Sequence, residues 1–176
     1  VTCKSFYTSK TLELARFIAE YYVCSLGEAL SLFVPSSSKD LHVNEKITTD
    51  IVLSLEQEKA YTFALSHDAS LLFGDTGSGK TEVYMKLFEA CINKGQKALF
   101  LLPEIGLTPQ MKKRLKHHFV THVAIWHSKI TLKKKAQILH DLQIGKLSIL
   151  AGTRSTLFLP IDNLGLIVVD EEHDES

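Results

Sequence analysis

The segment from Gly74 to Thr81 has the composition and spacing of a phosphate-binding loop. Its sequence, GDTGSGKT, fits the pattern G-x-x-x-x-G-K-[ST] at every fixed position. Glycines let the backbone curl so that N–H groups point at phosphate oxygens, and a helix beginning there adds its positive end. In this interpretation Lys80 reaches the β- and γ-phosphates and the Thr81 hydroxyl binds Mg²⁺. The predicted ATP-binding residues of the loop are Gly74, Asp75, Thr76, Gly77, Ser78, Gly79, Lys80 and Thr81.

Carboxylates follow an apolar stretch near the end of the chain and form a second candidate site. Residues 166–169 are apolar, and Asp170, Glu171, Glu172 and His173 come directly after them. At a strand tip Asp170 would hold Mg²⁺ through water, while Glu171 would orient and deprotonate the attacking water. A solvated acidic cluster is the alternative, but a P-loop upstream favours hydrolysis. We therefore expect Lys80, Asp170 and Glu171 to be the catalytic residues.

The elements that must position these residues alternate along the chain from about Asp50. Short apolar strands are expected at Ser70–Phe73, Lys97–Leu102, His122–Trp126, Leu147–Ala151 and Gly165–Val169. Helices are expected near Thr81–Asn93, Thr108–Phe119 and Leu132–Ile144. Apolar strands alternating with helices predict an α/β fold, in which a parallel sheet is covered on both faces.

The N-terminal part has a different pattern and is expected to be a helical extension. Apolar residues recur at helical spacing between Thr8 and Leu32, and the aromatic side chains of Phe17 and Tyr21 are expected to pack against other residues. Pro35 and the serines after it indicate a linker. The expected division is a helical segment at 1–35, a linker at 36–49 and a partial nucleotide-binding lobe at 50–176.

Composition excludes some classes of protein. Lys plus Arg and Asp plus Glu each number 20, so no overall basic field indicates a purely electrostatic DNA binder. The three cysteines form no C-x-x-C pair, which argues against a structural zinc site or a disulfide framework and favours a cytoplasmic protein. The apolar runs are too short to span a membrane. We expect the chain to be part of a longer protein, because it begins with Val1 and stops shortly after the acidic motif.

Several segments together resemble the PriA family of replication-restart helicases, in superfamily 2. Residues 103–110 (PEIGLTPQ) are similar to motif Ia of that family, and residues 152–160 (GTRSTLFLP) are similar to motif Ib. Asn163 to Leu166 lead into the DEEH sequence in the same manner, and residues 14–22 (LARFIAEYY) are similar to the family's segment before the winged helix. The resemblance is close from about Leu55 to Ser176.

The resemblance implies a RecA-like P-loop NTPase lobe in an ATP-driven 3′-to-5′ DNA helicase that restarts replication. It implies ATP and Mg²⁺ as cofactors, forked or single-stranded DNA as partner, and primosome and single-strand-binding proteins as further partners. The family's zinc-binding cysteines would lie beyond this segment. The DNA-contacting residues would be Thr108, Gln110, Thr153, Arg154 and Ser155. His173 would couple nucleotide state to the rest of the motor.

Three side-chain groups are weighed between a functional and a structural interpretation. Gln57 lies before the P-loop, where its amide can pair with the adenine edge, although an exposed position at a helix start is the alternative. A basic run on an expected helix is interpreted as a solvated face; its residues are Lys112, Lys113, Arg114 and Lys116, with His117 and His118. Trp126 is interpreted as a core residue, because it lies within an apolar strand.

The sequence departs from the family in ways that bear on activity. The stretch from Pro35 to Thr49 is too short for a winged helix, and the expected lobe is truncated after the acidic strand. In such lobes the next strand lies between the P-loop strand and the acidic strand. We therefore expect the chain alone to hydrolyse ATP very slowly and not to unwind DNA.

Alternative functions are a P-loop kinase or other nucleotide-dependent transferase, and a non-enzymatic module in which nucleotide switches binding to DNA or a partner. Product analysis separates a kinase, which phosphorylates an acceptor, from a motor, which releases phosphate. Nucleotide binding without turnover would favour the switch.

Overall fold

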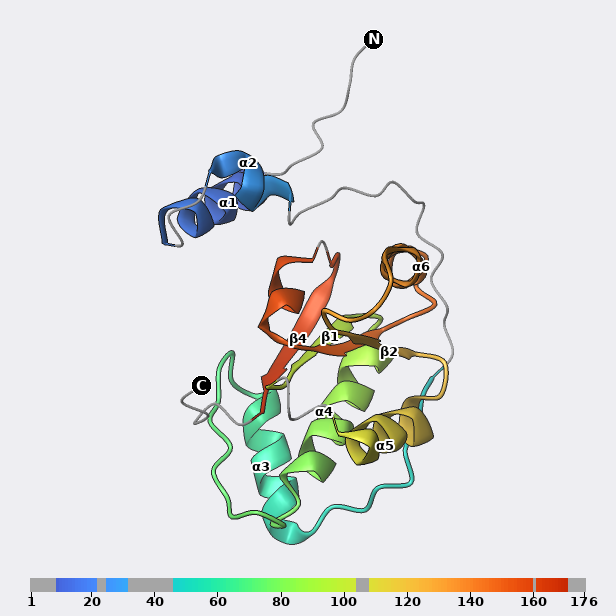
Figure 1. Ribbon diagram of the computed structural model, residues 1–176. Coiled ribbons are helices and arrows are strands. Elements are labelled where there is room, and N and C mark those ends of the chain that lie inside the picture. Colours follow the sequence, from blue (N-terminus) through green and yellow to red (C-terminus); the bar gives the residue numbers. More distant parts are fainter. Residues whose placement is uncertain (1–8, 22–24, 32–45, 104–107, 160, 171–176) are drawn as a thin grey trace.

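A sheet of four parallel strands forms the centre of the fold (Figure 1). The computed structural model describes residues 9–21, 25–31, 46–103, 108–159 and 161–170. The strands are β1 (Lys97–Leu101), β2 (Val123–Trp126), β3 (Ile149–Gly152) and β4 (Leu164–Val169). They lie in the order β2-β3-β1-β4, and all the pairings are parallel. The predicted α/β fold with a parallel sheet is thus confirmed.

The central strands β1 and β3 are apolar along their length because both of their faces are covered. All of β3 and all of β1 except Lys97 are buried. Their register joins Ala98 to Ile149 and Leu101 to Gly152, so both strands end at the same edge. The residues that follow their carboxyl ends are therefore brought together at one edge of the sheet.

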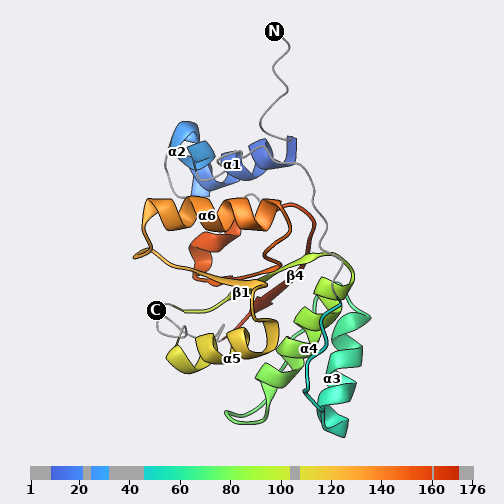
Figure 2. The same ribbon diagram turned by 90° about the vertical axis from the view of Figure 1, so that its right-hand side faces the viewer.

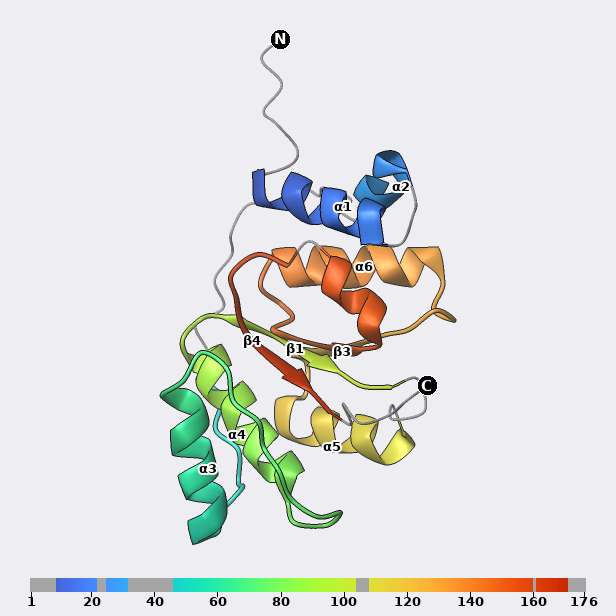
Figure 3. The ribbon, with the colours of Figure 1, turned by 90° about the vertical axis from the view of Figure 1, so that its left-hand side faces the viewer.

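Helices cover both faces of the sheet, as Figures 2 and 3 show from opposite sides. They are α4 (Lys80–Asn93), α5 (Pro109–Phe119) and α6 (Leu132–Gln143), and α3 (Leu55–Leu65) packs beside α4. On one face, α4 and α5 enclose a core whose most buried aromatic residues are Phe88, Phe100 and Phe119. On the other face, α6 packs through Ile138 and Leu142 against Trp126 and the sheet. The prediction that Trp126 is a core residue is confirmed.

Local sequence signals set where these helices begin. Thr108 caps α5, accepting a hydrogen bond from the Met111 amide at 3.2 Å, and Thr131 caps α6 in the same way through the Lys134 amide at 3.3 Å. A hydroxyl at this position satisfies an amide that the first turn leaves unpaired. These caps determine where α5 and α6 begin after the strands that precede them.

The N-terminal part contains α1 (Ser9–Tyr21) and α2 (Leu26–Ser31). Ala15 and Ile18 of α1 pack with Ala29 of α2, and Phe158 of the sheet domain packs against them. The expectation that the α1 aromatics are packed is wrong for the described pair. Phe17 and Tyr21 are 59% and 68% exposed, and their rings stack on each other with centroids 5.7 Å apart. Phe17 and Tyr21 lie on the outer side of α1, whereas Ala15 and Ile18 lie on the side that faces α2.

The expected strand at Ser70–Phe73 does not form, which corrects the prediction. The segment has no regular secondary structure, and Leu71 and Phe73 are 72% and 92% exposed. A strand needs a neighbour for its backbone hydrogen bonds. Among the described residues β4 pairs with β1 alone, and a hollow of about 350 Å³ lies between residues 69–72 and β4. Apolar sequence alone therefore did not suffice to add this segment to the sheet.

Candidate nucleotide-binding site

The glycine-rich loop adopts a left-handed conformation at two positions immediately before α4. Gly77 has φ +85° and Gly79, the residue before Lys80, has φ +83°, values that residues with side chains rarely adopt. The Ser78 amide donates to the Asp75 carbonyl at 3.1 Å, and the Glu82 amide donates to the Gly79 carbonyl at 3.1 Å. The loop is thus a closed turn continuous with the first turn of α4, as an anion-binding helix start requires.

The Lys80 side chain folds back across the loop that precedes it. Its Nζ atom donates to the Gly74 carbonyl and, at 3.1 Å, to the Asp75 carbonyl. Thr81 follows in the first turn of α4, where it is half-buried. Lys80 and Thr81 are thus the first two residues of α4, at the positive end of the helix.

Gln57 contacts the loop itself, through a capping arrangement that the sequence analysis missed. Its Oε1 accepts from the Ser54 amide at 2.8 Å, while the Ser54 hydroxyl accepts from the Gln57 amide at 3.3 Å. Its Nε2 donates to the Gly79 carbonyl at 3.2 Å. The spacing S-x-x-Q before a helix was the signal that could have revealed this capping box. Gln57 therefore ties the start of α3 to the P-loop.

A pocket of about 300 Å³ lies over the loop. The lining includes Gln57 from α3, Gly74 and Lys80 from the loop, and Phe73 before it. A hydrophobic side chain and convergent polar groups in one concave site are typical of ligand pockets. The size and lining of this pocket suit part of a nucleotide.

Asp170 lies at the carboxyl end of β4 and is held against the P-loop helix. Its amide donates to the Leu101 carbonyl at 3.0 Å, which continues the sheet by one residue. Its Oδ1 accepts from the Tyr84 hydroxyl of α4 at 3.3 Å. The structure thus brings together the helix that carries Lys80 and Thr81 and the first acidic residue. The predicted sites Glu171 and His173 lie outside the described residues.

The DNA-binding candidates lie beyond the carboxyl ends of β1 and β3. Thr108 and Gln110 are exposed at the start of α5, after β1. Arg154 and Ser155 are exposed in a short 3-10 helix, η1 (Arg154–Phe158), after β3. Thr153 is half-buried, and its Oγ1 lies 3.2 Å from the Ser155 Oγ. Since β1 and β3 are neighbours, the two segments share one edge of the sheet.

Thr156 supports this loop and was missed by the sequence analysis. It is fully buried, and its Oγ1 donates to the Thr153 carbonyl at 2.6 Å. The Thr156 methyl group also packs closely against Gly152, since a Cβ added at Gly152 would lie only 2.5 Å from it. The hydroxyl therefore holds the turn that presents Arg154, and a buried hydroxyl with this partner is satisfied.

Arg114 differs from the solvated residues expected in the basic run. Its guanidinium forms an ion pair with Glu82 Oε1 in the first turn of α4, next to the P-loop. The other carboxylate oxygen, Oε2, is buried and has no hydrogen-bond partner among the described residues. Arg114 thus links α5, which is capped by the DNA-binding candidate Thr108, to the P-loop helix.

Comparisons with known proteins agree with this geometry. The family model described as "DEAD/DEAH box helicase" matches residues 54–176. The chain belongs to the DEAD/DEAH box helicase family.

Relatives within that family include several proteins called replication restart protein PriA. The chain is 49% identical over 166 residues to that of Helicobacter pylori, covering 94% of this chain. It is 40% identical over 176 residues to that of Rickettsia felis, covering 96% of this chain. It is 34% identical over 175 residues to that of Treponema pallidum, covering 94% of this chain. The chain spans 27% of the length of each of these relatives.

The predicted resemblance to PriA and the predicted RecA-like helicase lobe are therefore confirmed. No described helix has both the length and the apolar character needed to cross a membrane.

Proposed function

We propose that the chain forms the ATP-binding lobe of a DNA helicase that restarts replication by moving 3′ to 5′ along a strand. The observation that carries this proposal is the juxtaposition of the P-loop at the start of α4 with Asp170 at the end of β4, linked through Tyr84. The family match supports a motor over a small-molecule kinase. In the proposal the lobe comprises residues 50–176.

The P-loop holds the triphosphate. Its amides and the Lys80 ammonium bind phosphate oxygens, and binding requires Lys80 to exchange its contacts with the Gly74 and Asp75 carbonyls for the phosphates. The Gln57 side-chain amide contacts the adenine edge. Its hydrogen bond to the Gly79 carbonyl already holds this amide close to the loop. Binding through backbone amides suits the phosphates of any nucleoside triphosphate.

Mg²⁺ fits the donors at this site, because the Thr81 hydroxyl and the Asp170 carboxylate are oxygen ligands and Tyr84 holds Asp170 against the helix that carries Thr81. When bound, the ion neutralises charge on the phosphates. Glu171 orients the attacking water and accepts its proton, and His173 couples hydrolysis to movement. Free phosphate and ADP are the products.

DNA binds along the edge formed by the residues after β1 and β3. Thr108, Gln110, Thr153 and Ser155 offer neutral donors, and Arg154 offers an exposed guanidinium. Such groups position a backbone without reading its bases. Forked DNA, primosome proteins and single-strand-binding protein are the proposed partners in the cytoplasm, and the zinc that the family's cysteines bind belongs to parts of the longer protein outside this segment.

The test is phosphate release with and without forked DNA, using Lys80→Ala as the blank. The assay is made on this chain and on a protein of the relatives' full length that carries it. We expect very slow release from the chain and strong DNA stimulation in the longer protein, abolished by Lys80→Ala. Turnover that is indifferent to DNA would contradict the motor, and a phosphorylated acceptor would indicate a transferase.

A further inference from the structure

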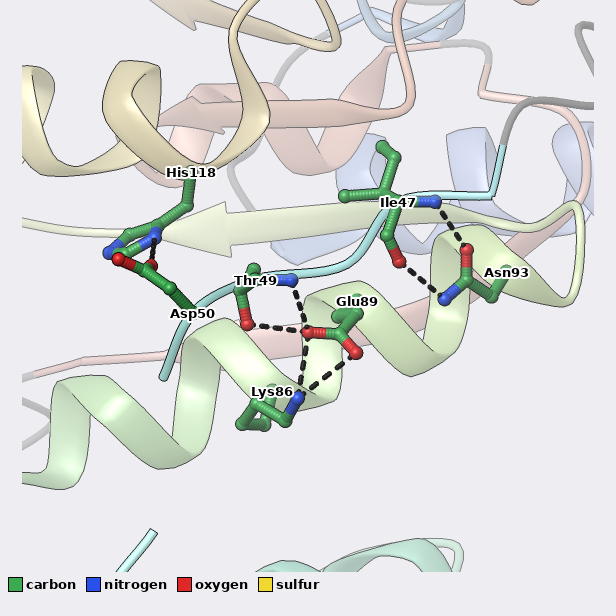
Figure 4. Close-up of polar contacts among 7 residues, drawn as sticks. All are labelled: Ile47, Thr49, Asp50, Lys86, Glu89, Asn93 and His118. Atoms are coloured by element: carbon green, nitrogen blue, oxygen red, sulfur yellow. Dashed lines mark hydrogen bonds and ion pairs between the residues drawn. The ribbon is translucent and has the colours of Figure 1, made fainter. Parts of the chain in front are cut away.

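Residues 46–50 run along α4 and are held there by a series of hydrogen bonds (Figure 4). The Asn93 side chain pairs with both backbone groups of Ile47, at 2.9 and 2.8 Å. The Glu89 Oε2 accepts from the amide and the hydroxyl of Thr49, at 3.0 and 2.5 Å. We call residues 46–50 the strap. Its path delivers the next side chain, Asp50, to the end of α5.

Glu89 anchors the strap as an ionised group. Burial of its carboxylate opposes ionisation, but hydrogen bonds from Lys86 and Thr49 outweigh this effect and lower the pKa of Glu89. Lys86 Nζ lies 2.8 Å from Glu89 Oε2. The position of the strap is therefore fixed by charge-assisted hydrogen bonds and not by backbone propensity alone.

Asp50 meets two histidines at the C-terminal end of α5. Its Oδ1 lies 3.2 Å from the Nδ1 of His118, whose side chain is only 12% exposed, while the Asp50 side chain is 77% exposed (Figure 4). The His117 ring lies beside the His118 ring, with centroids 4.9 Å apart and planes at 89°. One ligand atom from each of Asp50, His117 and His118 lies within 4.8 Å of the other two.

We propose that Asp50, His117 and His118 form a binding site for a transition-metal cation of the Zn²⁺ class. Two imidazole nitrogens and a carboxylate oxygen are a ligand set that Zn²⁺ accepts, with water completing the tetrahedron. Tetrahedral Zn²⁺ holds such ligand atoms about 3.4 Å apart. The His118–Asp50 pair already has this spacing, and the exposed His117 supplies a third ligand atom within 4.8 Å of the other two.

The site is separate from the nucleotide pocket. Because α4 and α5 both run from the carboxyl edge of the sheet to the amino edge, the end of α5 lies at the edge opposite the P-loop. Its nitrogen ligands also disfavour Mg²⁺, which prefers oxygen. A bound ion joins the strap to α5, while the strap is itself bonded to α4. The bound ion would thus hold in place the segment that leads into α3.

The experiment is a Zn²⁺ titration of the chain, followed by calorimetry, in a Cys3→Ser/Cys24→Ser background that removes competing thiolates. We expect one Zn²⁺ whose affinity falls at least about tenfold in His117→Ala and in Asp50→Asn, since losing a ligand costs more than losing an outer-shell partner. His140→Ala, on α6 at the other face, is the matched control and retains the affinity. Asp50 and His117 are both exposed, so replacing either leaves the fold intact.

A second measurement separates coordination from surface adsorption. Co²⁺ in place of Zn²⁺ should give visible absorption bands of a four- or five-coordinate ion, and these bands should be lost in His118→Gln. Zn²⁺ should also raise the midpoint of thermal unfolding in the parent background and not in Asp50→Asn. Equal affinity in the parent background, His117→Ala and Asp50→Asn, or no stoichiometric uptake, would overturn the proposal and leave an Asp50–His118 ion pair only.

Discussion

Replacing Gly79 with alanine should destabilise the chain through two separable effects. The first is backbone strain, because Gly79 has φ +83°. The second is steric, because a Cβ at this position would lie 2.1 Å from Gln57 Nε2. Gly77→Ala is a matched control for the first effect alone, since Gly77 has φ +85° and a Cβ added there would meet nothing within 4 Å.

The magnitudes follow from these contacts. A left-handed conformation costs an alanine about 1–2 kcal/mol, partly offset by the reduced freedom of the unfolded chain, so Gly77→Ala should cost about 1 kcal/mol. In Gly79→Ala the flexible Gln57 side chain must also move away. It then loses its hydrogen bond to the Gly79 carbonyl and its capping bond to the Ser54 amide, at about 1 kcal/mol each. Gly79→Ala should therefore cost about 3 kcal/mol.

Urea unfolding followed by circular dichroism measures these costs as free energies of unfolding. The decisive variant is Gly79→Ala in a Gln57→Ala background, because removing the amide removes the closest steric contact and leaves only Glu82 Oε2, at 3.2 Å, near the added Cβ. In that background the cost of Gly79→Ala should fall close to that of Gly77→Ala. Equal costs for Gly77→Ala and Gly79→Ala in the unmodified chain would refute the reasoning, since Gln57 would then not be held against the loop.

Further predictions concern the strap, the ion pair and the thiol. The lowered pKa of Glu89 means that its stabilising contribution is present above the ordinary glutamate value of 4.5 and is lost as pH falls through its folded pKa. Glu89→Gln should therefore flatten the loss of unfolding free energy on acidification, and an unchanged slope would argue against the strap contact. Arg114→Ala should cost about 1 kcal/mol in urea unfolding, because it leaves the half-buried Glu82 carboxylate unpaired, whereas the control Lys113→Ala should cost close to nothing. Burial raises the pKa of Cys91 to about 11. In a Cys3→Ser/Cys24→Ser background the chain should react with a disulfide reagent at about pH 8 only after unfolding, and rapid reaction of the folded chain would contradict the burial of this thiol.

The sequence was informative where one local pattern determines the geometry. The P-loop pattern predicted a curled glycine-rich backbone followed by a helix near Thr81, and the structure has left-handed angles at Gly77 and Gly79 and a helix that begins at Lys80. The four observed strands were also predicted, each from a short apolar run. The rule is that a strand covered on both faces reads as such a run, and it describes β1 and β3, whereas β4 is apolar although most of its residues are exposed. Asp170 was placed correctly at a strand tip, because it directly follows the apolar run of β4.

Contacts between distant segments could not be predicted from such patterns. The apolar run Ser70–Phe73 was assigned to the sheet, yet whether it pairs depends on what lies beside it. Glu82, the partner of Arg114, and Thr49, one partner of Glu89, are 32 and 40 residues away in the chain, and nothing in the local sequence specifies these contacts. Gln57 is an intermediate case. The S-x-x-Q spacing could have revealed its capping box, whereas no local pattern indicates its bond to the Gly79 carbonyl.

The proposed function requires that this lobe drive a DNA-dependent motor. Its direct test is phosphate release by the full-length protein carrying this chain, measured with and without forked DNA and with Lys80→Ala as the blank. We expect strong stimulation by DNA that disappears in Lys80→Ala. Release that DNA does not change, or that survives Lys80→Ala, would rule out such a motor.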